Sequence, residues 1–144
     1  MPRSAIDTNV LLRATLGDSP AQALAARALI DQSPEPLELP DVVVIEYVHV
    51  LESYYGFSRT QIVDLLGDII AHPQFSLHEN VISAAADLYL QHPKLSFTDC
   101  FLAEETRSEK LLCLYTFDRK LATQHDMATL IPPDFTRGRQ LPQE

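Results

Sequence analysis

The sequence predicts an α/β fold in which a short parallel sheet is flanked by helices, and three observations carry this prediction. Short apolar segments alternate with helical segments, the pattern of parallel strands joined by helical crossovers. The chain has 144 residues, 46% of them apolar, so one domain with a sizeable core is expected. A continuous apolar run over 111–116 is typical of a strand covered on both faces.

Helix caps, proline breakers and apolar runs predict the order of the elements. Residues 3–7 are expected to form a short buried strand, after which Asp7 caps a helix that ends near Leu16. Prolines at 34 and 36 end the next helix, because proline disfavours helical backbone at itself and at the preceding residue. Further helices are expected over 21–30, 41–55, 59–72, 80–91, from 97 onward and over 119–123, and further strands over 75–77, 111–116 and 129–131.

One domain and a short tail are expected from the distribution of these segments. Residues 1–131 hold every expected helix and strand, whereas 132–144 carry three prolines and few apolar residues, which predicts a loosely ordered tail. No apolar run approaches the roughly 20 residues that cross a bilayer, so no membrane contact is expected. An acid at position 7 interrupts any secretory signal, and two cysteines are too few for a disulfide scaffold, which predicts a cytoplasmic location.

The charge balance is acidic. The chain has 20 Asp and Glu against 11 Lys and Arg, a formal net charge of −9 at pH 7. This excludes a protein that holds nucleic acid through bulk positive charge. A nucleic-acid enzyme is still allowed, because metal-binding carboxylates and a small basic patch can share one surface.

Acids at the ends of expected strands are the first candidates for chemistry. In open parallel sheets the site forms beyond the carboxyl ends of the strands. Asp7 and Asp118 each follow an expected strand, so their carboxylates converge if the two strands are neighbours. Each acid alone is better explained as a helix N-cap, a role that contributes about 1 kcal/mol. Asp99 has a similar explanation, because it lies three residues after the expected cap Ser96.

Glu46 lies inside the expected third helix, five residues after the expected cap Asp41. Its neighbours one turn away are mostly apolar, which predicts a carboxylate that faces the protein rather than open water. Such a carboxylate needs a partner, because desolvating an unpaired one costs several kcal/mol. A cation shared with other acids and a salt bridge to an arginine both satisfy that need, and the residues leave both alternatives open.

Four segments resemble, in order, the four motifs of the PIN domain family. They are Ala5-Ile6-Asp7-Thr8-Asn9-Val10-Leu11-Leu12-Arg13, Ile45-Glu46-Tyr47-Val48-His49-Val50-Leu51, Leu95-Ser96-Phe97-Thr98-Asp99-Cys100 and Tyr115-Thr116-Phe117-Asp118-Arg119-Lys120. Each motif alone is weak, whereas four in order with the expected flanking helices are specific. The resemblance covers residues 3–131 and implies a three-layer PIN-like fold with a central short parallel sheet.

The resemblance also implies a Mg²⁺- or Mn²⁺-dependent endoribonuclease. The implied catalytic residues, which are also the implied metal ligands, are Asp7, Glu46, Asp99 and Asp118. The residues that would orient these acids are Thr8, Asn9 and Thr116. The basic residues that would contact the RNA backbone are Arg13, Arg119 and Lys120. Carboxylate oxygens suit these cations, which activate a bound water and bind phosphate. Ser96 stands where many relatives carry a further acid, which favours one tightly held cation.

Small members of this family most resemble VapC-like toxins of bacterial toxin–antitoxin pairs. That resemblance implies an RNA substrate, a cognate antitoxin protein and a homodimer. The antitoxin is expected to place a basic side chain near the carboxylates. The helix surface around Tyr47, Leu51 and Tyr54 is the expected dimer contact.

Two other classes of protein are weighed against this interpretation. An acid-based phosphatase of the haloacid-dehalogenase type needs a second Asp two residues after its nucleophile, where this chain has Asn9, and a receiver domain needs an acid pair before its first helix. A catalytically silent PIN-like module that binds RNA or protein is disfavoured, because all four acids are present. The five histidines carry no expected catalytic role, and Cys100 is expected to be a core thiol.

Overall fold

The computed structural model describes residues 2–141. The chain divides into two compact units, the first ending at Ser83 and the second beginning at Ala84. The division falls inside helix α5 (Glu79–Gln91). Within the described residues, no helix is long and apolar enough to span a membrane.

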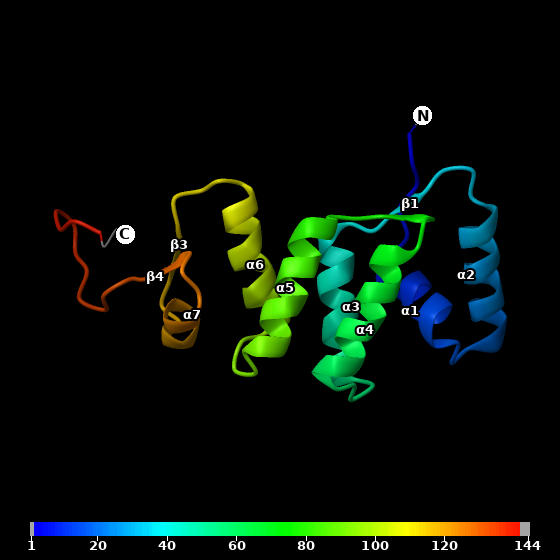
Figure 1. Ribbon diagram of the computed structural model, residues 1–144, viewed down its shortest axis with the longest axis horizontal. Helices are drawn as coiled ribbons and strands as arrows, with labels where there is room; N and C mark the ends of the chain where they lie inside the picture. Colours follow the sequence, from blue (N-terminus) through cyan, green and yellow to red (C-terminus); the bar gives the residue numbers. More distant parts are fainter. Residues whose placement is uncertain (1, 142–144) are drawn as a thin grey trace. The chain divides into compact units, whose positions relative to one another are not determined.

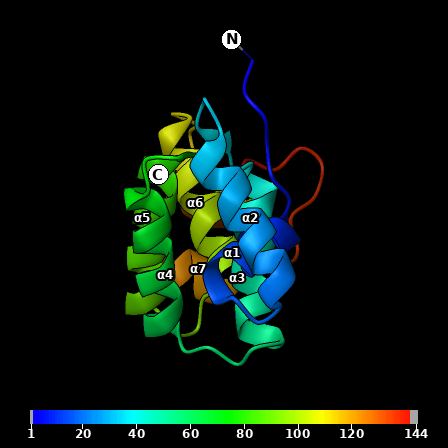
Figure 2. The ribbon, with the colours of Figure 1, turned by 90° about the vertical axis from the view of Figure 1, so that its right-hand side faces the viewer.

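The first unit is mostly helical. It contains α1 (Thr8–Leu16), α2 (Pro20–Gln32), β1 (Leu37–Glu38), α3 (Asp41–Ser53), α4 (Arg59–Ala71), β2 (Phe75–Ser76) and the start of α5. Helix α1 packs against both α2 and α3, and α3 packs against α4 (Figure 1). Figure 2 shows α1 and α2 side by side at the surface of this unit. The predicted helices of this unit are confirmed to within a few residues at their ends.

The strands of the first unit are short. Strands β1 and β2 pair in parallel, with Leu37 opposite Phe75 and Glu38 opposite Ser76. The expected buried strand over 3–7 is reduced to a single parallel bridge between Ala5 and Glu38, made by two backbone hydrogen bonds. It stays this short because Asp7 already caps α1, which begins at Thr8; Ile6 is the one buried residue before the helix among the described residues.

The core of the first unit lies between α1, α3 and α4. Its most buried side chains, each at most 1% exposed, include Leu11, Val44, Tyr47, Val48, Leu51, Ile62 and Leu66. The Tyr47 hydroxyl lies 2.9 Å from Oγ1 of Thr15 on α1, so this buried polar group has a partner. Tyr47 and Leu51 were expected at a dimer contact, but both are fully buried and offer no surface, whereas Tyr54 is 80% exposed. The expected contact is therefore wrong for Tyr47 and Leu51, because the side of α3 that carries these two residues faces α1 and α4.

The second unit combines helices with a second pair of parallel strands. It contains the rest of α5, α6 (Phe97–Ser108), β3 (Leu114–Thr116), α7 (Arg119–Gln124) and β4 (Ala128–Leu130). Strand β3 pairs with β4 in parallel over their three residues. Ser96 caps α6 by accepting a hydrogen bond from the Asp99 amide, as the sequence predicts.

The apolar run over 111–116 is not a strand covered on both faces. Only Leu114 to Thr116 is extended in β3, while Leu111 and Leu112 are 57% and 76% exposed. Lys110 has a left-handed backbone with a φ of 57°, and the Leu111 amide donates to the Thr106 carbonyl. These are the features of a helix C-terminus that closes on itself, so the first residues of the run end α6 instead of starting a strand.

A buried histidine joins three elements of the second unit. His125 is 4% exposed; its Nε2 pairs with the Glu104 carboxylate on α6, and its Nδ1 accepts a hydrogen bond from the Met127 amide. Arg107 pairs with both Glu104 and Asp126, and its hydrogen bond lowers the pKa of Asp126. The network fixes the joint between α7 and β4 against α6. The sequence did not predict this contact, because its partners come from separate segments.

The segment after β4 has turns but neither helix nor strand over its described residues, 132–141. An ion pair between Arg139 and Asp134 lies within it. Residues 142–144 of the predicted tail lie outside the described residues, and the domain boundary at residue 131 stays a prediction. The α/β class is confirmed, with helices and short parallel strands in both units. Among the described residues the named strands form two separate pairs, β1–β2 and β3–β4.

Candidate active site

Asp7 opens α1. It is the N-cap residue, and its Oδ1 accepts a hydrogen bond of 3.0 Å from the Val10 amide. The side chain is exposed, although Ile6 and Thr8 on either side are buried. The cap therefore fixes an exposed carboxylate at a defined place on a rigid helix end.

Glu46 lies in the middle of α3 and is exposed, which corrects the expectation that it faces the protein. The buried face of α3 carries Val43, Val44, Tyr47, Val48 and Leu51. Glu46 lies on the other side, where its neighbour one turn earlier, Val42, is itself 70% exposed. The prediction for Glu46 was wrong because the sequence does not distinguish an exposed valine from a buried one.

The first unit brings these two acids together. Asp7 and Glu46 line one cavity of about 260 Å³, and the other lining residues are Thr8, Asn9, Val42 and Val43. Two residues far apart in the sequence thus present carboxylates to the same space, with a threonine hydroxyl and an asparagine amide beside them. The side-chain donors of this lining offer oxygens and no thiolate or imidazole, which fits a hard cation such as Mg²⁺ or Mn²⁺.

The other two candidate acids belong to the second unit. Asp99 lies in the first turn of α6 and is half-buried. Asp118 follows β3 and caps α7, where its Oδ1 accepts from the amides of Lys120 and Leu121. Thr116 acts on Asp118 through its hydroxyl, which accepts a 2.9 Å hydrogen bond from the Asp118 amide. The predicted cap at Asp118 is confirmed, and its carboxylate, like that of Asp7, is held by backbone amides at a helix N-terminus.

The profile of the PIN domain matches residues 5–125 of the chain. The chain belongs to the PIN domain family. All four acids lie within the matched residues. PIN domains are generally nucleases, so the family supports hydrolysis of nucleic acid as the class of function. A search of curated proteins gave no match to the chain.

The bases of this PIN domain differ in their surroundings. Arg119 and Lys120 are exposed in the first turn of α7, directly after Asp118. Arg13 on α1 is instead engaged by neighbours in its own unit. Its Nη1 lies 2.9 Å from the Asp18 carboxylate, and its Nε donates to the Gln22 amide oxygen at 3.0 Å.

Tyr55 completes the arrangement around Arg13. Its hydroxyl donates to the second carboxylate oxygen of Asp18 and lies 3.4 Å from Arg13 Nη1. The Tyr55 hydrogen bond, followed by the charge of Arg13, lowers the pKa of Asp18, so this carboxylate is ionised at neutral pH. Because Asp18 compensates its charge, Arg13 is a weaker candidate for binding RNA phosphate than Arg119 or Lys120.

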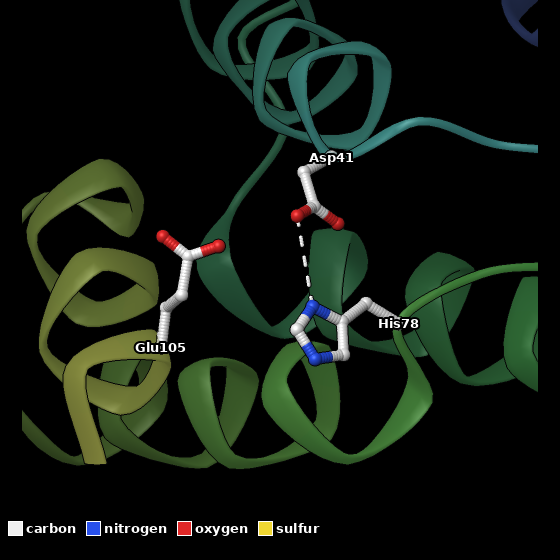
Figure 3. Close-up of side chains that lie close together, drawn as sticks. All are labelled: Asp41, His78 and Glu105. Atoms are coloured by element: carbon white, nitrogen blue, oxygen red, sulfur yellow. Dashed lines mark ion pairs between the residues drawn. The ribbon is translucent and has the colours of Figure 1, made fainter. Parts of the chain in front are cut away.

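Asp41 and His78 of the PIN domain form a pair that sequence reasoning missed. The Nδ1 atom of His78 lies 3.6 Å from an oxygen of Asp41, and Figure 3 shows the two side chains facing each other. Glu105, also drawn there, belongs to α6 in the second unit. Asp41 was expected to cap α3, but Pro40 is the cap residue and Asp41 is the first helical residue. No spacing in the sequence signals this pair, because β2 brings His78 back from a distant segment.

Proposed function

We propose that this PIN domain is a metal-dependent endoribonuclease and acts as the toxin of a toxin–antitoxin pair. The observation that supports it most is the cavity shared by the carboxylates of Asp7 and Glu46, with Asn9 at its edge. Two exposed acids that face one space repel each other unless a cation or a proton joins them. Asp99 and Asp118 enter the proposal through their motifs and their places at helix N-termini.

The four acids would hold one Mg²⁺ or Mn²⁺. When bound, such a cation lowers the pKa of a coordinated water and stabilises charge on the phosphoryl oxygens. The chain's own part is positioning. The Val10 amide fixes the Asp7 carboxylate, and the amides of Lys120 and Leu121 fix that of Asp118.

The polar neighbours of the acids supply hydrogen bonds rather than charge. Asn9 lines the cavity and can donate from its amide to a phosphate oxygen or to a water. Thr8 is 6% exposed and belongs to the lining of the same cavity. Arg119 and Lys120 are exposed at the start of α7, where they can approach the RNA backbone.

An RNA cleavage assay tests the enzymatic part of the proposal. The purified chain is incubated with total RNA in Mg²⁺, in Mn²⁺ and in excess EDTA, and fragments are resolved on a denaturing gel. Cleavage is expected with either cation and none in EDTA. Binding of RNA without cleavage in any of the three buffers would favour the silent module, and an acyl-phosphate trapped on an acid would favour a phosphatase.

A cognate antitoxin would explain how a protein with a net charge of −9 and an exposed acidic cavity is held inactive. We expect a partner with a basic side chain near Glu46, because that charge offsets the carboxylates and competes with the cation. The chain is co-expressed with the product of the reading frame just upstream, and Mn²⁺ is titrated into the purified complex. Cleavage is expected to return as Mn²⁺ rises. Inhibition that survives removal of the partner's carboxyl-terminal segment would place the contact away from the cavity.

Glu46→Gln is expected to raise the melting temperature in EDTA by about 1–2 °C. The change removes one of two like charges at the cavity without creating a hole, and exposed charge pairs contribute about 0.2–1 kcal/mol. The gain should shrink in Mn²⁺, because a bound cation stabilises the native wild type by mass action. Differential scanning calorimetry measures both values, with Asp64→Asn on α4 as a matched change at an exposed acid. A lower melting temperature in EDTA would show a structural salt bridge at Glu46 instead.

A further inference from the structure

A second cavity of about 370 Å³ lies beside the acidic one in the first unit. Its lining residues are Asp7, Asn9, Val10, Arg13, Gln22, Ala25, Ala26 and Leu29, so its walls are α1 and α2. Asp7 and Asn9 line both cavities. A ligand in the second cavity would therefore continue directly into the space where the carboxylates lie.

The floor of this cavity is apolar, and the cavity is open because small side chains line it. Ala25 and Ala26 occupy neighbouring positions of α2 where a longer side chain would fill the space, and Val10 and Leu29 flank them. The volume lies within the range of small-ligand pockets, roughly 300–1,000 Å³. A cavity of this size with apolar side chains in its lining has room for one planar ring system.

The polar edge of the cavity selects a neutral ligand. Arg13 is the one cation in the lining, and Asp18 already compensates its charge at 2.9 Å. The Gln22 amide oxygen is occupied by Arg13 Nε, so the amide is held in one orientation and its NH₂ group is left as the donor. Asp7 and Asn9 also line this cavity, but they belong to the part that it shares with the acidic cavity. On the α2 side, Gln22 therefore offers hydrogen-bond donors to a ligand that carries acceptors and no phosphate charge.

We propose that this cavity binds one base of the RNA substrate, next to the phosphodiester that is cut, and that it favours guanine over adenine. The inference rests on the proposed ribonuclease function and adds a specificity-determining subsite to it. Guanine presents two adjacent acceptors, O6 and N7, on one edge, whereas adenine pairs its N7 acceptor with a donor. A glutamine that reads adenine needs its oxygen free, and the Gln22 oxygen is engaged by Arg13.

Sequencing of cleavage ends tests the subsite. Wild type cuts an RNA pool that is randomised in sequence, and the bases on each side of the cuts are counted. Guanine is expected to exceed adenine by about fivefold at one fixed position, the factor that one neutral hydrogen bond supplies. Gln22→Glu keeps an acceptor for Arg13 but removes the donors, so the preference should fall to about one. An unchanged preference in Gln22→Glu would overturn the assignment.

Filling the cavity gives an independent test. Ala25→Leu is expected to lower the rate of cleavage and remove the base preference, while Ala28→Leu on an exposed position of the same helix, outside the lining, should match wild type. Ala25 is exposed, so melting curves of both variants should coincide. If Ala25→Leu leaves the cut sites unchanged and instead stops inhibition by the upstream protein, the cavity docks that partner and the base proposal is wrong.

A nucleoside titration separates failure of the subsite from failure of the proposed function. Guanosine and adenosine, which carry no phosphodiester bond to be cleaved, are titrated into the ¹⁵N-labelled chain in EDTA. Guanosine is expected to shift amide resonances of α1 and α2 at lower concentration than adenosine. Wild type that cleaves RNA without a guanine preference contradicts the subsite and leaves the ribonuclease intact. Wild type that cleaves no RNA but binds guanosine in this cavity contradicts the ribonuclease and leaves the base site intact.

Discussion

Asp7→Asn is expected to abolish metal-dependent RNA cleavage while the protein stays folded. Asparagine keeps the size of the side chain and an oxygen that can accept from the Val10 amide, so the cap of α1 survives. The substitution removes one of the two negative charges that line the acidic cavity and leaves the charge of Glu46. Changes of groups that only orient a metal ligand already cost 10–100-fold, so loss of a ligand charge should cost more than about 100-fold.

The measurement is initial cleavage rate in Mn²⁺ for wild type, Asp7→Asn and Asp99→Asn, with circular dichroism and melting curves on the same samples. Asp99→Asn is expected to behave alike, since its amide still donates to Ser96 and the start of α6 is kept. Asp64→Asn serves as the control, because it changes an exposed acid on α4 outside the cavity. Full cleavage by folded Asp7→Asn, or by wild type in excess EDTA, would refute the mechanism and leave capping as the whole role of Asp7.

Tyr47→Ala is expected to destabilise the chain by about 3–5 kcal/mol, the cost of removing a buried aromatic side chain. Tyr47 is fully buried on α3, and burial raises the pKa of its hydroxyl to about 12. A loss of this size is a large fraction of the 5–15 kcal/mol that stabilises a typical domain. Tyr47→Phe removes only the hydrogen bond to Thr15 and should cost about 1 kcal/mol.

Urea unfolding followed by circular dichroism gives both free energies, and sedimentation of the folded variants gives their oligomeric state. Tyr54→Ala is the surface counterpart, because its side chain is 80% exposed at the end of α3, and its stability should stay near that of wild type. If Tyr47→Ala stayed as stable as wild type and changed only the oligomeric state, the packing around α1 and α4 described above would be refuted.

Local signals explain why most of the helices were predictable. Asp7, Ser96 and Asp118 all cap the helices that the sequence assigned to them, because a cap needs only a short polar side chain and the amides that follow it. The same local information located four candidate acids. It did not place Glu46 correctly, since the exposure of Val42 depends on which other helices cover α3.

Contacts between distant segments account for what the sequence did not reveal. The pair of Asp41 with His78 and the pair of Glu104 with His125 are each made by segments that meet only in the fold. Strand β1, which is two residues long and forms by pairing with the distant β2, was not predicted. The cavity between α1 and α2 depends on alanines that look like ordinary helix formers in the sequence.

The pairing of Arg13 with Asp18 has a consequence for how RNA binding should respond to ionic strength. A cation that already has a carboxylate partner releases few counterions from a nucleic acid when it meets a phosphate. The logarithm of the RNA association constant should therefore fall only gently with the logarithm of salt concentration, with a slope set mainly by Arg119 and Lys120. The substrate preference of such a surface would change little between low and high salt concentration, because shape and hydrogen bonds determine the preference rather than the counterion atmosphere of the RNA.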